Sequence, residues 1–311
     1  MQEIIACVMN ISEGRDISTL DAIAANIEKI DKSFLLHFCS DPAHHRAVFS
    51  FIGTPYSIAS AAFAATTTAV ELIDLTKHRG VHPRVGAVDV IPFVPIQGLS
   101  MKKCVQVAYQ LAERIGQELE IPVYLYGEAA TRPSSKNLST IRAGEFERLG
   151  EQLDKDPNRK PDFGPPCIHP TAGAVVVGAR QLMIAFNIYL ESSDPTIARS
   201  IASRVRESGG GLPGIKALGF YITHLDRAQV SINVMDYRKT SLLKIFDRVC
   251  VEAHQLGTGV ESSEIIGLVP QDALKEDVAS AIQLKGFTPS QVLENNIRST
   301  PLGSDIGRIE Q

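Results

Sequence analysis

The sequence is poor in cysteine, has no hydrophobic run long enough to span a membrane and carries no excess of positive charge. Its five cysteines are scattered and form no Cys-x-x-Cys pair, which favours a reduced cytoplasm over a disulfide scaffold. The first residues lack the positive charge of a secretion signal. A net charge of −4 and an isoelectric point near 6.1 argue against nucleic acid as the main partner. We therefore expect a cytoplasmic globular protein that binds neither membranes nor nucleic acid.

The hydrophobic pattern of the first hundred residues predicts a regular succession of strands and helices. Ser18 and Thr19 are the expected caps of the first helix, and Thr54 with Pro55 opens the second. The predicted order is β-α-β-β-α-β, with strands at 3–9, 34–39, 47–52 and 87–94 and helices at 20–31 and 54–75. This order is that of a ferredoxin-like unit.

The same order recurs in the second half of the 311-residue chain. Strands are predicted at 181–189, 215–222, 228–235 and 259–268, and helices at 194–207 and 241–256. We interpret the repeat as a duplication, which gives an α+β protein of two tandem ferredoxin-like (βαββαβ) subdomains, residues 1–180 and 181–311. Two such halves would leave a cleft between their sheets, a usual place for a ligand.

Two further segments do not fit the repeat. After a predicted helix at 101–120 and a strand at 121–126, residues 127–172 are interrupted by proline and glycine, with one helix expected near 138–149. We interpret this section as an insertion that carries function, because long irregular stretches are uncommon inside compact domains. The tail beyond residue 285 has little pattern, and we expect it to pack loosely.

The most unusual stretch is a basic loop at residues 78–86 that bears His82. Pro83 excludes a regular helix there and favours an extended backbone at His82. Arg79 and Arg84 are close in sequence, and nearby cations disfavour the protonated form of an imidazole. We therefore expect a neutral His82 that can accept a proton. The alternative is a surface loop whose histidine bonds only to backbone.

A second unusual loop lies at residues 161–173. Three prolines and two glycines within 164–173 indicate a shaped and ordered backbone that could line a flat ligand. The alternative is a rigid connector between the two halves.

The histidines and glycines show no recognised spacing for a metal or a phosphate. His78 and His82 are four residues apart, but a glycine and a proline prevent the helix that would bring them together. The adjacent His44 and His45 point in different directions on an extended backbone. The glycine run at 208–214 lacks the Gly-Lys-Ser/Thr of a P-loop, and we interpret it as a connector. We predict no metal site.

Six segments of the chain, in this order along it, resemble the glutamate formimidoyltransferases, a family that also forms the N-terminal part of animal formimidoyltransferase-cyclodeaminase. The matching segments are 10–14, 82–90, 123–129, 161–164, 185–188 and 267–270. The resemblance implies transfer of a formimino group from N-formimino-L-glutamate to N5 of tetrahydrofolate, which acts as a co-substrate. It also implies two ferredoxin-like halves with folate in a tunnel between their sheets, and a homodimer. The separate cyclodeaminase domain is not expected in this chain.

The resemblance also assigns residues. It implies that His82 is the catalytic residue and that the folate-binding loop consists of Gly164, Pro165, Pro166, Cys167, Ile168, His169, Pro170, Thr171, Ala172 and Gly173.

This chemistry suits a histidine. Tetrahydrofolate N5 attacks an amidine-like carbon, and the resulting tetrahedral intermediate collapses once the glutamate nitrogen gains a proton. One group that first takes and then returns a proton is sufficient, and histidine titrates near working pH. Both substrates carry carboxylates, so we select Arg46, Arg79 and Arg84 as binding candidates through forked hydrogen bonds.

The chain departs from the animal members at the aspartate that is thought to assist the histidine, where it has Cys39. A thiol cannot replace a carboxylate as an imidazole partner. Asp41 lies two residues further on, shares that face if the strand continues, and is the candidate replacement, so we count it among the substrate-binding candidates. Val81 and His37 also replace acidic residues of the family. These changes bear on rate and donor specificity.

Two functional hypotheses follow. The first is the transferase, with N-formyl-glutamate as donor or 5-formyl-tetrahydrofolate as substrate in a close variant. The second is a folate-binding protein with impaired catalysis. His82 beside Arg84 favours the first, and loss of the aspartate favours the second.

Overall fold

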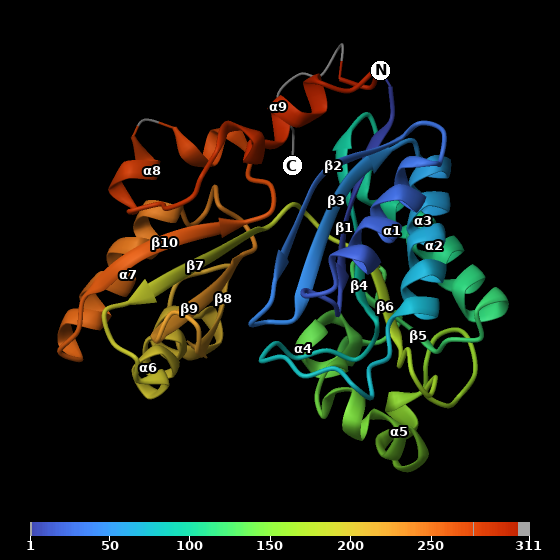
Figure 1. The fold of residues 1–311 in the computed structure, drawn as a ribbon, viewed down its shortest axis with the longest axis horizontal. Coiled ribbons are helices and arrows are strands. Elements are labelled where there is room, and N and C mark those ends of the chain that lie inside the picture. The colour runs from blue at the N-terminus through green and yellow to red at the C-terminus, as the bar shows by residue number, and fades with distance from the viewer. Residues whose placement is uncertain (1, 276, 304–311) are drawn as a thin grey trace. The chain divides into compact units, whose positions relative to one another are not determined.

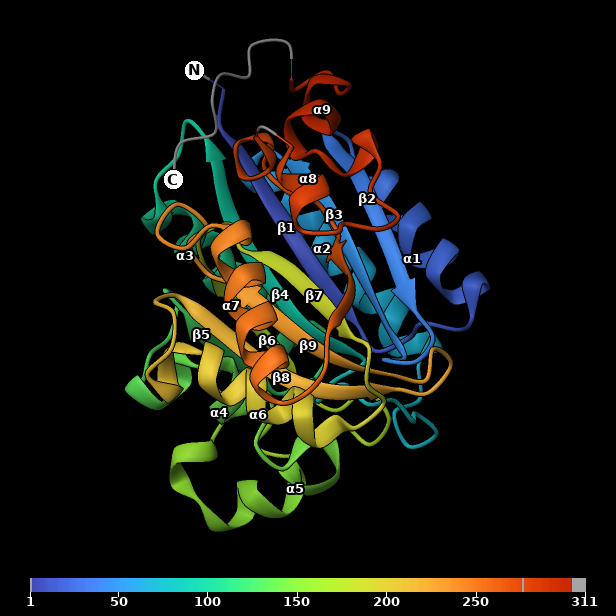
Figure 2. The same cartoon turned by 90° about the vertical axis from the view of Figure 1, so that its left-hand side faces the viewer.

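The structure is a computed structural model that describes residues 2–275 and 277–303. The chain forms two compact units, and each is described by itself (Figures 1 and 2). Unit 1 comprises residues up to Arg180 together with 300–303 of the described tail, and unit 2 comprises Gln181–Ser299. Both are mixtures of helices and sheet, so the α+β class predicted from the sequence is confirmed.

Unit 1 contains a six-stranded sheet in the order β2-β3-β1-β4-β6-β5 (Figure 1). Its first four strands are antiparallel neighbours: β1 Ile4–Ile11, β2 Ser33–Asp41, β3 Arg46–Gly53 and β4 Val88–Gln97. The two additional strands, β5 Val123–Gly127 and β6 Val175–Ala179, run parallel to β4. The sequence pattern did not predict β6.

Helices cover both faces of this sheet, but unequally. The helices α1 Ile17–Glu28, α2 Pro55–Leu72 and α3 Met101–Glu118 lie on one face over the main core, to which Phe49, Phe51 and Phe93 contribute (Figure 1). A smaller core on the other face contains Tyr124 and Tyr126. It includes side chains from α4 Leu138–Ile141 and α5 Glu145–Lys155.

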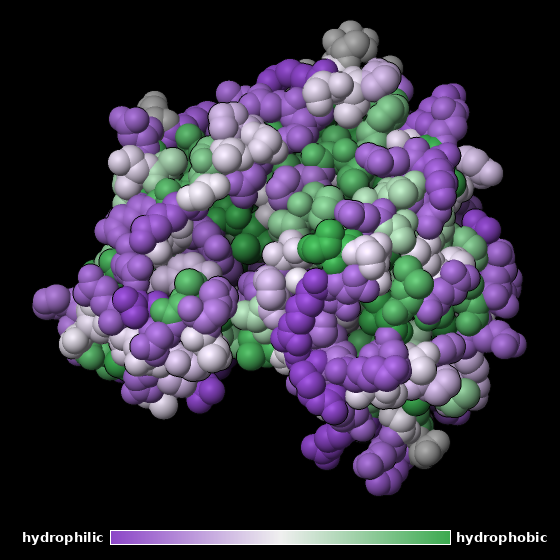
Figure 3. Space-filling model, in the orientation of Figure 1, coloured by the Kyte–Doolittle hydropathy of each residue, from purple (hydrophilic) through white to green (hydrophobic). Residues whose placement is uncertain are grey.

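Local capping explains where these helices begin. Asp16 caps α1 by accepting hydrogen bonds from the backbone of Ser18 and Thr19, so the prediction of Ser18 and Thr19 as caps was wrong by two and three residues. Thr54 caps α2 as predicted, in a reciprocal bond with Ser57. The single helix expected near 138–149 is two helices, separated by a turn in which Gly144 has φ +91°. Hydrophilic residues predominate on the surface over α5 (Figure 3).

Unit 2 repeats the element order of the start of unit 1. Its four-stranded antiparallel sheet has the order β10-β7-β9-β8, with β7 Ile184–Leu190, β8 Ile215–Ile222, β9 Arg227–Val234 and β10 Val260–Ile266. The helices α6 Pro195–Val205 and α7 Leu242–Gln255 pack on one face, over a core that contains Phe186 and Phe246. As predicted, Asp194 caps α6.

Within its described part, residues 286–303, the tail is ordered, and there the prediction of loose packing was wrong; residues 304–311 lie outside the described residues. After α8 Val278–Ala281, Leu284 forms a bridge with Ser263 of β10, and Val292 forms one with Val269, beyond the end of that strand. The helix α9 Leu293–Arg298 then buries Leu293 and Ile297. Short apolar runs without a clear period gave no signal for this packing. None of the helices within residues 2–275 and 277–303 combines the length and apolar character of a membrane span.

Candidate functional site

The imidazole of His82 lies against Arg46, the first residue of β3. Its Nδ1 is 2.8 Å from the carbonyl oxygen of Pro83 and 3.0 Å from Nη1 of Arg46. A neutral ring that accepts from Arg46 at Nδ1 carries its hydrogen on Nε2, whereas the tautomer with its hydrogen on Nδ1 donates to Pro83 and leaves the Nε2 lone pair available. Since His82 is only partly buried, this nitrogen is suited to accept a proton.

Burial and nearby positive charge both favour a neutral His82 ring. Burial, followed by the guanidinium groups of Arg46 and Arg142, holds the pKa of His82 well below its usual range. The sequence analysis expected this effect from Arg79 and Arg84. The structure instead supplies it from residues that are 36 and 60 positions away in the chain (82 − 46 and 142 − 82).

Asp89 on β4 connects the two guanidinium groups. Its carboxylate is completely buried and accepts hydrogen bonds from Arg46 at 2.9 Å, from Arg142 and from the backbone of Val85 at 3.0 Å. Burial by itself raises the pKa of Asp89, but Arg142 and Arg46 outweigh that effect and hold it below its usual value. Arg46 is also fixed by Asn10, whose Oδ1 accepts two of its hydrogen bonds at 3.0 and 2.6 Å.

The turn between β2 and β3 places an acid and a second imidazole beside His82. Asp41 accepts a hydrogen bond from Nδ1 of His44 at 2.6 Å, and from the backbone of Ala43 and His44. Against the cost of its burial, these bonds lower the pKa of Asp41 to about 2. The His44 ring lies 6.2 Å from the His82 ring, centre to centre. Among its described hydrogen bonds, Asp41 thus binds His44 and not His82.

The two arginines next to His82 in sequence have other contacts. Arg84 is buried and donates to Nδ1 of His78 at 3.0 Å, to Glu147 at 2.6 and 2.8 Å, and to Glu145 at 3.1 Å. Arg79 is exposed and donates only from Nη1, to carbonyl oxygens of its own loop. Arg84 thus anchors α5 to the loop, while Arg79 keeps Nε and Nη2 without a hydrogen-bond partner among the described residues.

The end of the loop at 164–173 is bound to the His82 loop through backbone. Thr171 accepts a hydrogen bond from Leu75 at 2.8 Å, and Ala172 accepts one from Ala87 at 2.9 Å. Gly86 is required at this contact, because a Cβ there would lie 1.9 Å from the carbonyl oxygen of Ala174. The two sequence-predicted loops therefore meet. The middle of the 164–173 loop, including Cys167, is exposed.

Profiles of known families match both units. The profile described as the formiminotransferase domain, N-terminal subdomain, matches residues 4–180, and that of the formiminotransferase domain matches 185–286. The chain belongs to the formiminotransferase family. The family resemblance drawn from the sequence is thereby confirmed.

Formiminotransferase relatives match over nearly the whole chain. The glutamate formimidoyltransferase of Streptococcus pyogenes serotype M1 is 42% identical over 298 residues, which cover 96% of this chain and 99% of the relative. That of Thermoplasma acidophilum is also 42% identical, with coverage of 94% and 97%. The mouse formimidoyltransferase-cyclodeaminase is 42% identical over 90% of this chain and 52% of the relative.

Within this candidate site, sequence reasoning missed Arg142 and His44. Arg142 follows α4 in the predicted insertion, where nothing marks it out from the other arginines. A signal did exist in β4, because Asp89 is an acid within an apolar strand and a buried carboxylate requires a cation. The sequence could therefore have indicated that a partner was needed, but not which one.

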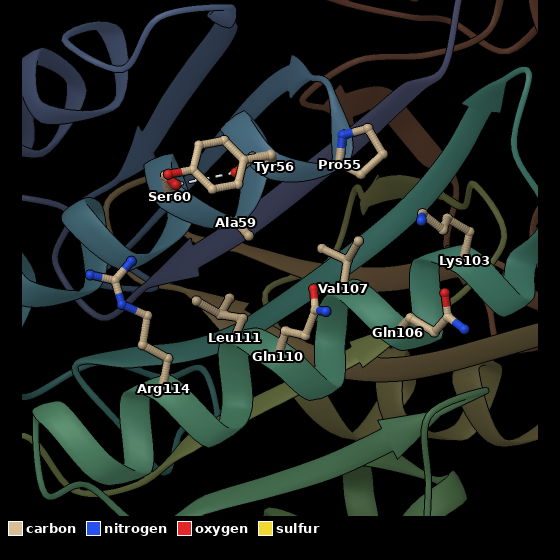
Figure 4. Close-up of a pocket in the computed structure, with 10 residues that line it drawn as sticks. All are labelled: Pro55, Tyr56, Ala59, Ser60, Lys103, Gln106, Val107, Gln110, Leu111 and Arg114. Carbon is tan, nitrogen blue, oxygen red and sulfur yellow. Dashed lines mark hydrogen bonds between the residues drawn. The ribbon is translucent and has the colours of Figure 1, made fainter.

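Two other features of the formiminotransferase chain lie outside this site. A groove of about 330 Å³ between α2 and α3 is lined by Tyr56, Lys103 and Arg114 among others, on the side of the sheet that α1, α2 and α3 cover (Figure 4). It contains none of the residues that surround His82. Among residues 2–275 and 277–303, no three His, Cys, Asp or Glu side chains are grouped so that they could hold a metal ion.

Proposed function

We propose that this protein is a glutamate formimidoyltransferase, which moves the formimino group of N-formimino-L-glutamate to N5 of tetrahydrofolate. The observation that carries the proposal is a neutral, partly exposed imidazole at His82 in a chain 42% identical to relatives of that name over nearly its full length. In this proposal the folate is a co-substrate and no metal takes part.

His82 is proposed as the general base and then the general acid. Nε2 takes the proton of N5 as the new carbon–nitrogen bond forms, and a proton returns to the glutamate nitrogen as its bond to the same carbon breaks. The Nδ1 bond to Pro83 fixes the ring for this role. A group of this kind typically contributes about 10²–10⁴-fold in rate, so alignment of the two substrates must supply much of the remainder.

The substrate carboxylates are proposed to bind guanidinium groups. Arg79 is supported by its exposure and its unused donors. Arg142, whose Nη1 has no hydrogen-bond partner among the described residues, is a second candidate. Arg46 and Arg84 are engaged in the protein, and we assign them supporting roles. Folate is proposed to contact residues 164–173, whose backbone joins the His82 loop.

The finer fold expectations also belong to this proposal. Each half is proposed to be a ferredoxin-like module, supported by the β-α-β-β-α-β order. When the strands of each half are numbered from its first, β2-β3-β1-β4 and β8-β9-β7-β10 are the same order. The tunnel between the subdomains, the homodimer and the cytoplasmic location remain predictions from the resemblance and the composition.

The test is direct. Purified protein, tetrahydrofolate and N-formimino-glutamate are mixed, and 5-formimino-tetrahydrofolate is followed by its absorbance. We expect turnover in the native protein and a loss of at least about 100-fold in His82→Ala, with folate affinity retained. His254→Ala, at an exposed position on α7, is the matched control.

Other outcomes would redirect the assignment. Turnover only with N-formyl-glutamate or 5-formyl-tetrahydrofolate would identify the formyl variant. Folate binding without turnover from any of these donors would identify the binding protein, which loss of the family aspartate at Cys39 favours. Undiminished turnover in His82→Ala would exclude the mechanism.

A further inference from the structure

A β-bulge in β2 decides which side chains of that strand face the candidate site. The register of β2 against β3 shifts between Leu35 and His37, so Leu35 pairs with Phe51 but His37 pairs with Ser50. Without the extra residue, His37 would pair with Phe49, whose side chain lies in the main core of unit 1. Bulges commonly occur beside active sites, where they re-aim a side chain. This bulge turns His37 away from the core.

The face to which the bulge turns His37 is the one that carries Asp41 and Arg46. These two residues pair with each other, four positions later on β2 than His37 and four positions earlier on β3 than Ser50. Because alternate residues of a strand share a face, His37 and Asp41 lie on one side of the sheet. Four residues of strand span about 13 Å, so His37 lies about that far along the face from Asp41 and from the Arg46 that contacts His82.

The imidazole of His37 lacks a hydrogen bond that its burial requires. Its Nδ1 is buried and has no hydrogen-bond partner among the described residues. Burial also lowers the pKa of His37, so the ring is neutral near pH 7. Buried polar atoms in native proteins are almost always bonded to protein, water or a ligand. Since the residue is partly exposed on the face of the candidate site, the unmet Nδ1 indicates a ligand there.

The surroundings of His37 on this face indicate which part of a ligand fits. Ser50, directly opposite on β3, is 4% exposed and adds a hydroxyl group. A neutral imidazole and a hydroxyl suit a neutral amide, because they supply hydrogen bonds without charge. Tetrahydrofolate has such an amide, which joins its p-aminobenzoyl ring to glutamate. The pteridine ring and N-formimino-glutamate are too short to extend over about 13 Å from a reaction at His82, whereas the p-aminobenzoyl-glutamate arm is long enough.

We propose that His37 binds the p-aminobenzoyl-glutamate arm of tetrahydrofolate, with its Nδ1 bonded to the amide of that arm. This inference rests on the proposed function, which makes tetrahydrofolate the co-substrate. His37 contacts no reacting atom and is therefore a binding residue. The bulge at Leu36 is the backbone feature that positions it.

The binding test separates the arm from the ring. Dissociation constants are measured by calorimetry, without donor, for tetrahydrofolate, for p-aminobenzoyl-glutamate and for 6-methyl-tetrahydropterin, which lacks the arm. His37→Phe keeps a flat ring without nitrogen, and His254→Phe, at an exposed position on α7, is the matched control. We expect His37→Phe to bind tetrahydrofolate and the arm about 3- to 10-fold more weakly, the usual effect of one lost hydrogen bond, and to bind the tetrahydropterin with native affinity. His254→Phe should bind all three as the native protein does.

Two further variants identify the nitrogen that is used. An asparagine amide lies near the position of Nδ1, whereas a glutamine amide lies near that of Nε2. We therefore expect His37→Asn to restore most of the affinity that His37→Phe loses, and His37→Gln to restore little.

The kinetics provide an independent readout. His37→Phe should raise KM for tetrahydrofolate by the same factor as the dissociation constant and leave kcat within about twofold of native, because the contact with the arm is the same before and during the reaction. KM for N-formimino-glutamate should not change.

The outcomes separate this inference from the proposed function. Native affinity for tetrahydrofolate in a folded His37→Phe protein, or equal weakening for the tetrahydropterin, would overturn the contact with the arm. So would a native protein that binds tetrahydrofolate and the tetrahydropterin equally well. Weakening confined to ligands with the arm, in a protein that turns over no formimino or formyl donor, would instead overturn the proposed function. If His37→Phe does not fold, His37→Gln replaces it in each comparison, because it keeps a polar side chain of similar length.

Discussion

Arg46 donates a hydrogen bond to Oδ2 of Asp89 at 2.9 Å, and that carboxylate is completely buried. Arg142 donates to the same oxygen. One buried acid therefore holds in place both guanidinium groups that, together with the larger effect of burial, lower the pKa of His82.

Asp89→Asn should lower both the unfolding free energy of the protein and its turnover. The substitution leaves two largely buried guanidinium groups without their counter-charge, and removal of one partner from a buried pair typically costs about 3–5 kcal/mol. Urea unfolding at neutral pH measures the loss. A change below about 1 kcal/mol would contradict the ion-pair arrangement. We also expect turnover to fall at least tenfold, because Arg46 and Arg142 lose their common anchor.

Arg84→Gln should mainly lower the stability of the protein and Arg79→Gln should mainly raise KM, although both arginines flank His82. Arg84 is buried and bound to Glu145, Glu147 and His78, so its loss should lower the unfolding free energy by about 1–3 kcal/mol. Arg79 is exposed, and its loss should change stability by less than about 0.5 kcal/mol. Under the proposed function, Arg79→Gln should raise KM for N-formimino-glutamate severalfold. Unfolding curves and initial rates distinguish the two, and a reversal of the pattern would refute the assignment.

The stability of unit 1 should fall as the pH drops from about 6.5 to about 4. Burial is the main cause that lowers the pKa of His78 to about 4, and its Nδ1 already accepts a hydrogen bond from Arg84. Between the unfolded and folded pKa values the unfolded chain binds more protons, so the contribution of His78 is complete above pH 6.5 and is lost on acidification.

The size of this effect is roughly 2–3 kcal/mol, at about 1.4 kcal/mol per pKa unit. His78→Gln removes the titrating group, so its unfolding free energy should depend less steeply on pH over this range. His254→Gln serves as a control that should keep the native slope. Equal slopes in His78→Gln and the native protein would contradict a lowered pKa of His78 in the folded protein.

Gly173→Ala should be considerably more harmful than Gly257→Ala, although the two glycines have nearly equal φ values of +73° and +75°. A Cβ at Gly257 meets nothing within 4 Å, so only the left-handed backbone is penalised, at about 1–2 kcal/mol. A Cβ at Gly173 would lie 2.2 Å from the carbonyl oxygen of Val85, which adds about 1–3 kcal/mol. Thermal unfolding measures both. We also expect Gly173→Ala alone to impair turnover, because it separates the two loops of the site.

Elements with strong local patterns could be predicted from the sequence. The succession of strands and helices in both halves follows hydrophobic period, and caps such as Thr54 and Asp194 mark helix starts. Strand β6 was missed because a five-residue apolar run after an irregular segment does not show what it pairs with. Its parallel partners β4 and β5 come from far earlier in the chain.

The candidate site, like the fold, could be predicted only in part from the sequence. Proline and histidine in one loop indicated His82, and the prolines and glycines of 164–173 indicated the second loop. The partners of each charge could not be predicted, because an arginine looks the same in sequence whether it serves a carboxylate or a substrate. Arg84, which we expected to bind substrate, instead binds α5, whereas Arg142, which the sequence did not single out, lies near His82. Asp41 is connected to the site only through His44, which lies on the turn between β2 and β3.

The position of β6 also bears on how the protein is made. Val90 of β4 pairs with Val176, so the sheet stays open between β4 and β5 until that last short strand has left the ribosome. The carbonyl groups of Thr171 and Ala172, which bind the His82 loop, immediately precede β6 and are set with it. A nascent chain that stops before Val175 therefore contains His82, Arg46, Asp89 and Arg142 but lacks the strand pairing that closes the sheet, so under the proposed function we expect no turnover before unit 1 is complete.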